Sequence, residues 1–568
     1  MLNNLPPHWD QEVDFIAIGS GAAGLGAAIV AHDLGASAVV LERAPKVGGV
    51  TALSMGEVWV AGNHHAAALG IEDSADSGFR YLQRLSMGYG NDAAALNLAI
   101  HGREALRWFE DKAGLRMKVA RHIPDYYYGR NNHAVAEGRM LEPEPFAAET
   151  LGEWQDRTRV SPLMPYGLTH DEMHGWGGTA NIANWDFQVM GDRLVKDERC
   201  LGPGLAAYFV KAALDRGIPL MTGTNVTGLI GDGERVIGVR AEQDGRTIHI
   251  KGRKGVLVAV SSYERNPEYN RMIGQQLNIG SMVISTVDGA NFRLCGPFGA
   301  RFARVPDMTL VGFTIPGEED EEGHQLWRSG LQPIGQPHII VVNGAAKRFA
   351  NEAFYRDFGF ALDRIDASNQ THPNFPCWAI MDDRARQKYP FGGLMPGQEL
   401  PEGVGVSAPT LAELAAKIGL DAAALADTVA RFNLHAAEGR DPEFGRGTHP
   451  WSAWMSGDPN QKPNPNLGTL EQGPFHAITL KRMGGSAIPS TGILADHHCR
   501  ALAWDDQPIA GLYVAGNSLA RMETGAMMQS GMSNARGITT GWLAARHAMG
   551  DPSPLLEQAI AAMGQPGA

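Results

Sequence analysis

Three glycines and one acid near the amino terminus have the types and spacing of a dinucleotide-binding site. Gly19, Gly21 and Gly24 follow the spacing G-x-G-x-x-G, and Glu42 stands further along the chain. In such a unit the first glycine makes a tight turn, the second lets the backbone approach a pyrophosphate, and the third lets a helix pack against a strand. An acid after the next strand accepts hydrogen bonds from ribose hydroxyls. The pattern predicts a dinucleotide site and favours a flavoprotein.

The elements that must position these residues are visible in the same stretch. An apolar run from Phe15 to Ile18 predicts a buried parallel strand, and small residues as far as about His32 predict a helix. A second apolar run, Ala38 to Leu41, ends directly before the acid. The start of the helix offers free N–H groups and a positive dipole end to phosphates. Because strand, glycines, helix, strand and acid occur in order, a glycine-rich turn without a ligand is disfavoured.

Composition narrows the classes of protein. A chain of 568 residues predicts two or three domains, and 44% hydrophobic with 20% charged residues is typical of a globular protein. A net charge of −13 without a basic cluster argues against nucleic acid as a partner. No apolar run is long enough for a membrane span, and no signal-peptide pattern begins the chain. Four scattered cysteines without a C-x-x-C pair favour a cytoplasmic protein with reduced thiols. They are Cys200, Cys295, Cys377 and Cys499.

The organisation along the chain suggests an insertion. Residues 205–215 predict a helix, and residues 219–260 predict short strands joined by turns. The acidic run Glu318 to Glu322 is interpreted as a solvated turn, and Ser456 to Gly468 as a linker rich in proline and asparagine. A strand reading GLYVAGN at 511–517 precedes a closing helix from about Met532 to Met549. Nucleotide-binding elements therefore lie at both ends of the chain, with another domain between them.

Together these pieces resemble the flavoprotein family that contains soluble fumarate reductases and 3-ketosteroid dehydrogenases. Four motifs carry the resemblance: LERAPKVGGVTALSMG at 41–56, VVNGAAKRFANEAFY at 341–355, RFNLHAAEGRDPEFGRG at 431–447, and the GLYVAGN strand with its closing helix. The resemblance implies an α/β fold. A doubly wound, Rossmann-like FAD-binding domain is formed by residues 1–282 and 470–568, and an α+β catalytic domain, residues 283–469, is inserted between its halves.

The resemblance implies FAD as the cofactor and no metal. No histidine or cysteine stands beside the loop from Val47 to Gly56, so we expect FAD to bind without a covalent link. The chain departs from the family's Ala-x-Gly-Gly at Ala259, which is followed by Val260, Ser261 and Ser262, and it has Met55 within Ser-Met-Gly where Ser-Gly-Gly is common. The residues expected to bind FAD are Gly19, Gly21, Ala22, Ala23, Gly24, Glu42, Arg43, Gly48, Gly49, Val50, Thr51, Val226, Ala259, Gly516, Asn517, Gly531 and Met532.

The fumarate-reductase branch of this family needs cations for a dicarboxylate. In that branch histidines precede the Met-Gly-Gly motif, whereas here Lys481 and Arg482 precede Met483-Gly484-Gly485. The segment before the last helix, 524–531, contains no arginine and is apolar where a dianion would need charge. A reductase is therefore disfavoured, although Lys481 or Arg482 remains a candidate for binding an anion.

The ketosteroid-dehydrogenase branch fits better. Its chemistry desaturates the bond beside a ketone: a base removes the α-proton, donors stabilise the enolate oxygen, and hydride passes from the β-carbon to flavin N5. Tyr355, one residue out of frame, resembles the family's general base. The segment Pro124 to Tyr128 is similar to the one that carries a second catalytic tyrosine, with Tyr126 and Tyr127 as the candidates.

The family's third tyrosine precedes a glycine that opens the last helix. Aligning that glycine with Gly531 places Met527 at the tyrosine position, where it cannot donate a hydrogen bond, so the Gly531 N–H alone would polarise the carbonyl. The expected function is FAD-dependent desaturation of a 3-ketosteroid or a smaller cyclic ketone, with an external electron acceptor. Two alternatives stay open: an enoate reductase of the fumarate type, and an NAD(P)-binding protein without flavin. The oligomeric state is not predicted.

Overall fold

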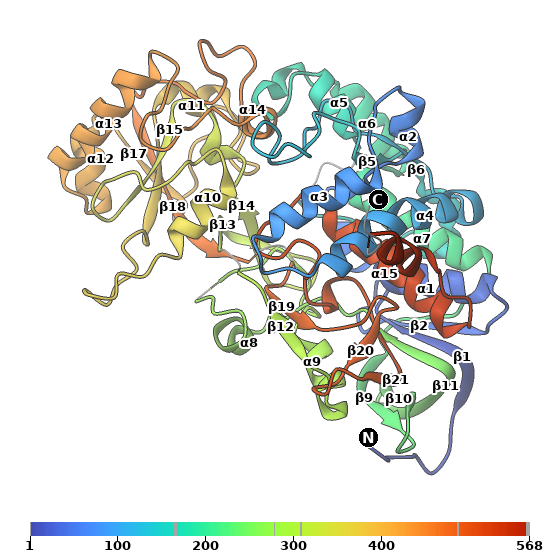
Figure 1. The fold of residues 1–568 in the computed structure, drawn as a ribbon. Coiled ribbons are helices and arrows are strands. Elements are labelled where there is room, and N and C mark those ends of the chain that lie inside the picture. The colour runs from blue at the N-terminus through green and yellow to red at the C-terminus, as the bar shows by residue number, and fades with distance from the viewer. Residues whose placement is uncertain (1, 164–166, 278, 307–308, 485–487, 564–568) are drawn as a thin grey trace.

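The computed structural model describes residues 2–163, 167–277, 279–306, 309–484 and 488–563, and it has two lobes, each built on a sheet (Figure 1). The first sheet draws its strands from both ends of the chain, in the order β20-β21-β11-β1-β2-β8. The strands of this path are β1 (Gln11–Ile18), β2 (Ala38–Leu41), β8 (Leu220–Met221), β11 (Arg246–Val258), β20 (Arg500–Leu502) and β21 (Pro508–Val514).

Central strands of the first sheet are parallel and buried on both faces. β1 pairs with β2 and with β11, and β21 pairs with the far side of β11, all in parallel. Their continuous apolar runs are typical of strands covered on both faces. Parallel strands end at one edge of a sheet, so the segments that follow them, beginning at Gly19, Glu42, Ala259 and Ala515, lie at the same edge. Ligands bind at this edge in open α/β sheets.

Helices cover one face of this sheet, and a smaller β layer with a short helix covers the other. The covering helices are α1 (Ala22–Asp33), α4 (Asp92–Ala113), α7 (Leu201–Asp215) and α15 (Met532–Ala548). The opposite layer contains β9 (Asn225–Gly231), β10 (Val236–Gln243) and α9 (Ala290–Cys295). Small residues let α1 pack closely: a Cβ on Gly24 would lie 1.9 Å from the Gly19 carbonyl oxygen, and one on Gly541 of α15 would lie 2.4 Å from the Ala23 carbonyl oxygen.

The second sheet belongs to the inserted lobe and has the order β14-β13-β18-β16-β15, with β17 also paired to β18. Its strands are β13 (Leu310–Glu319), β14 (Gln325–Ser329), β15 (Ile339–Asn343), β16 (Cys377–Met381), β17 (Gly405–Ala408) and β18 (Phe475–Met483). Its helices are α10 (Tyr355–Leu362), α11 (Asp383–Lys388), α12 (Leu411–Ile418), α13 (Ala422–Ala436) and α14 (Pro450–Ser456). Because β18 pairs with three strands of this sheet, the second sheet continues beyond the predicted boundary between residues 469 and 470.

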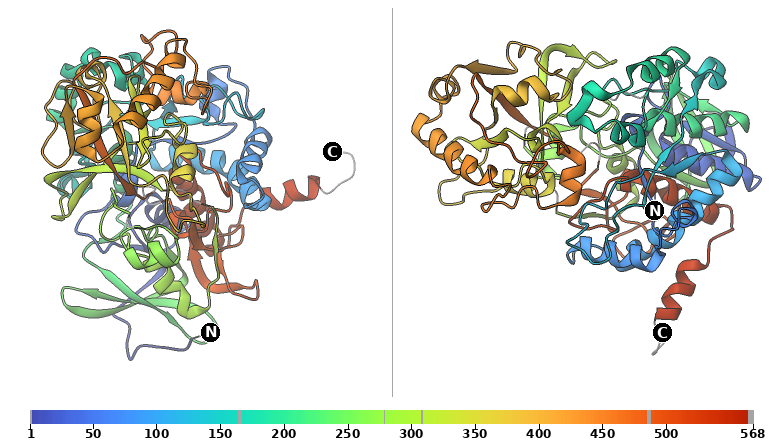
Figure 2. Two further views of the ribbon diagram at one scale, coloured as in Figure 1. Left: turned by 90° about the vertical axis from the view of Figure 1, so that its left-hand side faces the viewer. Right: turned by 90° about the horizontal axis from the view of Figure 1, so that it is seen from above.

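Short elements connect and surround the two lobes. The other α-helices of the described chain are α2 (His64–Ala68), α3 (Ala75–Ser86), α5 (His170–Gly175), α6 (Phe187–Lys196), α8 (Pro267–Met272) and α16 (Leu555–Met563). The other strands are β3 (Val58–Trp59), β4 (Met117–Val119), β5 (Met140–Pro143), β6 (Phe146–Ala147), β7 (Glu198–Arg199), β12 (Phe302–Arg304) and β19 (Thr491–Ile493). Figure 2 shows α16 projecting from the rest of the molecule. None of the helices in the described ranges is long and apolar enough to cross a bilayer.

The acidic run from Glu318 to Glu322 covers the end of β13 and part of the partly exposed turn before β14, and it also forms ion pairs. Lys46 Nζ lies 2.9 Å from a carboxylate oxygen of Glu321, and Arg265 Nη2 lies 3.2 Å from one of Asp320. Both cations lie outside the second sheet, in the segments around the first. The run therefore ties the inserted lobe to the rest of the chain through ion pairs, which a local pattern of acids cannot reveal.

Candidate active site

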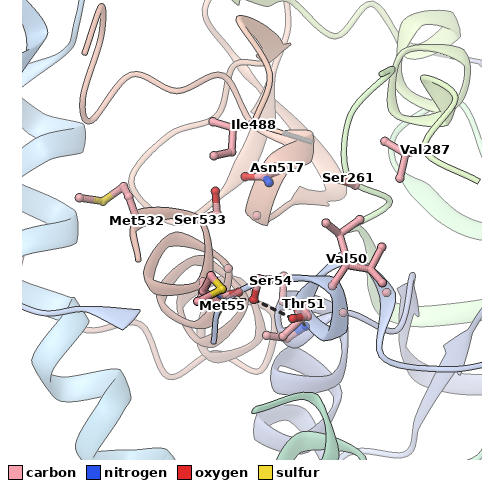
Figure 3. Close-up of a pocket in the computed structure, with 18 of the residues that line it drawn as sticks. Val50, Thr51, Ser54, Met55, Ser261, Val287, Ile488, Asn517, Met532 and Ser533 are labelled. Carbon is pink, nitrogen blue, oxygen red and sulfur yellow. Dashed lines mark hydrogen bonds between the residues drawn. The ribbon is translucent and has the colours of Figure 1, made fainter. Parts of the chain in front are cut away.

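A single large cavity collects residues from both lobes. Its empty volume is about 1920 Å³ when its opening to solvent is included. Figure 3 shows Val50 and Thr51 from the loop after β2 together with Asn517 and Ser533 from the carboxyl-terminal segment. The cavity therefore lies between the loop after β2 and the carboxyl-terminal segment.

Most residues expected to bind the cofactor line this cavity. Those that do are Gly19, Gly21, Ala22, Ala23, Glu42, Arg43, Gly49, Val50, Thr51, Ala259, Gly516, Asn517, Gly531 and Met532. Gly24, Gly48 and Val226 are not among the described lining residues. Gly24 serves the close packing of α1 against the turn, and Val226 is buried in the apolar layer beneath the sheet.

The glycine turn has the geometry of a phosphate cradle. Gly19 has a φ of +102°, and a Cβ there would lie 2.4 Å from the carbonyl oxygen of Ala259 on the neighbouring strand, so no other residue fits. Gly21 begins α1 without a side-chain cap, which leaves N–H groups of the first turn available to an anion. The Ala22 N–H already donates to Thr51 Oγ1 at 3.1 Å. These features fit the pyrophosphate of FAD.

Glu42 is buried and fixed by hydrogen bonds at the edge of the sheet. One carboxylate oxygen accepts from the Ser20 N–H at 3.1 Å and from the Ser20 hydroxyl at 2.6 Å, and the other accepts from the Ala44 N–H at 2.8 Å. Each carboxylate oxygen can accept about two hydrogen bonds, so the second keeps acceptor capacity toward the cavity. Its role as the ribose acceptor stays a prediction with suitable geometry.

Tyr126 and Tyr355 meet in the cavity although they are far apart in sequence. Their rings are 5.7 Å apart and edge to face, and the ring of Trp451 lies 4.3 Å from Tyr126 and 5.5 Å from Tyr355. The Tyr126 N–H donates to Gln529 Oε1 at 2.9 Å, which joins this loop to the segment before α15. Tyr355 begins α10. Both phenols are buried, and both line the cavity.

The preceding acid fixes the loop that carries Tyr126. Asp125 accepts from Trp59 Nε1 at 2.8 Å and from Arg139 Nη1 at 2.9 Å, and it is fully buried. A paired buried carboxylate of this kind resists displacement because breaking it leaves a charge without a partner. Asp125 therefore holds the backbone beside Tyr126.

Burial raises the pKa of both phenols above the usual value. For Tyr355 the Arg356 guanidinium and the hydrogen bond from Tyr126 offset part of this rise. Burial raises the pKa of Tyr126 well above its usual value. Tyr355 is therefore the phenol of the pair that the surroundings favour as an anion.

The structure separates the three consecutive tyrosines. Tyr127 is not among the described lining residues, and its ring packs edge-on against Phe354 at 5.5 Å, with Arg356 beside its hydroxyl. The side chain of Tyr128 is 37% exposed at the surface. Of the two predicted candidates, Tyr126 reaches the cavity.

Gly531 lies where a carbonyl-polarising donor is expected. It precedes α15 with a φ of +74°, and a Cβ there would lie 2.7 Å from the Trp59 nitrogen. Within the described chain, its own N–H makes no hydrogen bond, so that donor is available to a ligand. Met527 is partly buried against an apolar cluster and does not line the cavity, whereas Met528 does.

Among the lining residues that were not predicted from the sequence are Glu57, Ser530 and Arg356. Glu57 is buried and accepts a hydrogen bond from the Ser530 hydroxyl, and Arg356 is buried beside both Tyr355 and Tyr127. Its position directly after the predicted base Tyr355 was the one signal in the sequence from which Arg356 could have been predicted. No local sequence pattern predicts the contact between Glu57 and Ser530.

The two cations considered for an anionic substrate lie elsewhere. Lys481 Nζ donates to Thr314 Oγ1 at 2.6 Å, and the Arg482 guanidinium stacks 4.4 Å from the Phe375 ring. Neither residue lines the cavity as described. Gly485 of the same motif lies outside the described residues. The cations among the described lining residues are Arg43, next to Glu42, and Arg356, next to Tyr355.

A comparison with known proteins agrees with this geometry. Residues 14–533 match a family model described as FAD binding domain. The chain belongs to this FAD-binding family. FAD is therefore its cofactor, as the sequence predicted, and the family match favours FAD over an NAD(P) site without flavin. Among the described residues no histidine or cysteine lines the cavity, which agrees with binding without a covalent link.

Known dehydrogenases are similar to this FAD-binding chain over most of its length. It is 32% identical to a 4-oxocyclohexanecarboxylate 2-dehydrogenase of Sinomonas cyclohexanicum, over 97% of this chain and 95% of that protein. It is 32% identical to a 3-oxosteroid 1-dehydrogenase of Mycolicibacterium smegmatis, over 89% and 92%. A solved 3-ketosteroid delta1-dehydrogenase from Sterolibacterium denitrificans has a TM-score of 0.87 and 30% identity, and the match covers 95% of this chain and 100% of that chain. The predicted α/β fold and the resemblance to the dehydrogenases are confirmed.

Proposed function

We propose that the protein is an FAD-dependent dehydrogenase that introduces a double bond beside the ketone of a cyclic substrate. The observation that carries this proposal is the placement of Tyr126, Tyr355 and Gly531 in one cavity with the phosphate cradle. A base, a second phenol and a free N–H donor are the groups that α-proton removal and enolate stabilisation require. The names of the relatives support a cyclic ketone as the substrate class.

The reaction divides between the cofactor and the chain. FAD, when bound, supplies the acceptor for the hydride that leaves the β-carbon. Tyr355, as the phenolate, takes the α-proton, and the positive charge of Arg356 favours that anion. Tyr126 donates a hydrogen bond to the Tyr355 oxygen. The Gly531 N–H donates to the carbonyl oxygen of the substrate, where negative charge develops. Trp451 and Tyr126 pack closely around the base and exclude water.

The lining away from the cradle is mostly apolar and suits a hydrocarbon ring. Leu310, Leu331, Trp451 and Met455 come from the inserted lobe. We take a 3-ketosteroid and a smaller cyclic ketone as the two candidate substrates, and an external electron acceptor as the oxidant of the reduced cofactor. The four cysteines are buried and free of disulfides, which supports a reducing compartment such as the cytoplasm.

An anaerobic screen tests the proposal. Purified holoenzyme is mixed with 3-ketosteroids, with 4-oxocyclohexanecarboxylate and with fumarate as separate additions, and flavin absorbance near 450 nm is followed. We expect a cyclic ketone to bleach the flavin and to be converted to its enone. If no ketone bleaches it, and fumarate reoxidises the reduced enzyme faster than any enone, the enoate-reductase alternative replaces this proposal.

A further inference from the structure

Desaturation beside a ketone leaves one proton on the protein in every turnover, and the structure shows the phenols buried away from solvent. The α-carbon loses a proton while the β-carbon loses a hydride, so each enone formed releases one proton to Tyr355. A buried tyrosine cannot keep that proton and act again as a base. Given the proposed function, the proton must therefore pass from Tyr355 to another group.

A continuous row of proton-carrying groups begins at the base. The hydroxyls of Tyr355 and Tyr126 are hydrogen-bonded, and the Tyr126 hydroxyl is hydrogen-bonded to Ser530. The Ser530 hydroxyl in turn donates to a carboxylate oxygen of Glu57. All four residues line the same cavity.

The directions of these hydrogen bonds depend on where the proton is. A carboxylate only accepts, and a hydroxyl has a single proton to donate, so Ser530 donates to Glu57 and can accept from Tyr126. While Tyr355 is the phenolate, Tyr126 donates to it. Once Tyr355 has taken the α-proton, it can donate to Tyr126, and the protons of the row then point toward Glu57.

Other charged groups beside the phenols cannot take this role. Arg356 and Arg521 act on the pKa of Tyr355, but a guanidinium is already protonated and has no acceptor. Glu42 and Glu57 are the carboxylates among the described lining residues, and Glu42 is bonded to Ser20 at the cradle. Glu57 is the carboxylate whose charge acts on both Tyr126 and Tyr355.

A buried histidine lies beside Glu57 and does not extend the row. His170 begins α5, and its Nε2 lies 3.5 Å from the other carboxylate oxygen of Glu57. The same nitrogen lies 3.1 Å from the Met55 carbonyl oxygen, which can only accept, so Nε2 already carries a proton. The row therefore ends at Glu57.

We propose that Glu57, reached through Tyr126 and Ser530, accepts the α-proton from Tyr355. In this step the α C–H bond breaks, the O–H bond of Tyr355 forms, and each hydroxyl of the row gives its proton to the next until an O–H bond forms on Glu57. The electron pair of the α C–H bond remains in the substrate and becomes the second bond of the new C=C, while the electron pair of the β C–H bond leaves with the hydride. Glu57 and Ser530 are positioning and relay residues, because neither touches the reacting carbon.

Exchange of the α-hydrogen with deuterium isolates this step from hydride transfer. Holoenzyme reduced anaerobically with dithionite cannot accept hydride, so a bound ketone can only exchange its α-hydrogen. The ketone is the one that bleaches the wild-type flavin, and its deuterium content is followed in D₂O by mass spectrometry. We expect Glu57→Gln to slow exchange by about 10²-fold or more, the scale of a lost general acid–base group, while FAD content and ketone affinity stay unchanged.

Ser530→Ala is the second variant, because it removes the hydroxyl between Tyr126 and Glu57 without changing the charge of the site. We expect it to slow exchange by about 10-fold or more. The matched control is Ser452→Ala, a buried serine on α14 whose hydroxyl has no hydrogen-bond partner in the described structure and which does not line the cavity. It should exchange at the wild-type rate. FAD absorbance and the dissociation constant of the ketone are measured for all three.

The outcomes separate the relay from the proposed function. If wild-type enzyme exchanges and both Glu57→Gln and Ser530→Ala exchange at the same rate, the relay is wrong and the dehydrogenase stands. If no cyclic ketone exchanges or bleaches the wild-type flavin, the proposed function itself fails. If Glu57→Gln loses FAD, Ser530→Ala decides: wild-type exchange in that variant overturns the relay.

Discussion

Replacing Tyr355 by phenylalanine removes the base and keeps the packing around it. The phenyl ring retains its contacts with Tyr126 at 5.7 Å and Trp451 at 5.5 Å, so the cavity keeps its shape. The stability lost is that of one buried hydrogen bond, about 0.5–1.5 kcal/mol. The catalytic loss is larger: a general base contributes about 10²–10⁴-fold, which at about 1.4 kcal/mol for each tenfold is about 3–5 kcal/mol.

The assay for this variant is flavin reduction by the ketone under anaerobic conditions, followed in a stopped-flow instrument. We expect Tyr355→Phe to reduce its flavin about 10²–10⁴-fold more slowly while its FAD content equals that of the wild type. Tyr127→Phe is the matched control, because it removes the same hydroxyl from a residue outside the described lining. If Tyr355→Phe reduces flavin at the wild-type rate, or if Tyr127→Phe is slowed as much as Tyr355→Phe, the assignment of the base is wrong.

Three further predictions follow from the charges and contacts of the site. Because the phenolate of Tyr355 is the active form, the rate of flavin reduction should rise with pH. Arg356 lowers the pKa of Tyr355, so Arg356→Gln should move this rise to higher pH. A pH–rate profile that does not move would contradict the role of the cation. Glu42→Ala should lose FAD on extensive dialysis, since a charged acceptor for ribose hydroxyls contributes about 1.5–3 kcal/mol, and full FAD occupancy afterwards would show that Glu42 does not hold the ribose. Acid precipitation should release all the flavin into the supernatant, because no histidine or cysteine lines the described cavity; a yellow pellet would reveal a covalent link.

Much of the cofactor site could be predicted from the sequence because it is local. The strand, turn and helix around Gly19 follow one another directly, and β1, α1 and β2 lie close to where the apolar pattern places them. The closing helix begins at Met532 as predicted. Elements of this kind can be located from the sequence alone because each residue contacts its near neighbours in the chain.

The boundary of the inserted lobe could not be found in this way. The stretch from Ser456 to Gly468 has the composition of a linker, but β18 beyond it pairs with β13, β16 and β17. Strand pairing across the whole lobe decides where that lobe ends, and composition does not report it.

The chemistry of the site depends on contacts between distant residues. Which of the adjacent tyrosines reaches the cavity is set by the hydrogen bond from the Tyr126 backbone to Gln529, far along the chain. The pairing of Ser530 with Glu57 likewise joins opposite ends of the sequence. A single sequence contains the residues of such pairs but not the fold that brings them together.

A single-turnover measurement tests the central claim most directly. Holoenzyme is mixed anaerobically with less than one equivalent of 4-oxocyclohexanecarboxylate or of a 3-ketosteroid, and both the loss of absorbance near 450 nm and the organic product are quantified. The account predicts one reduced flavin for each molecule of conjugated enone formed from at least one of these ketones. Enzyme that keeps its oxidised flavin with both ketones, and returns both unchanged, would contradict it.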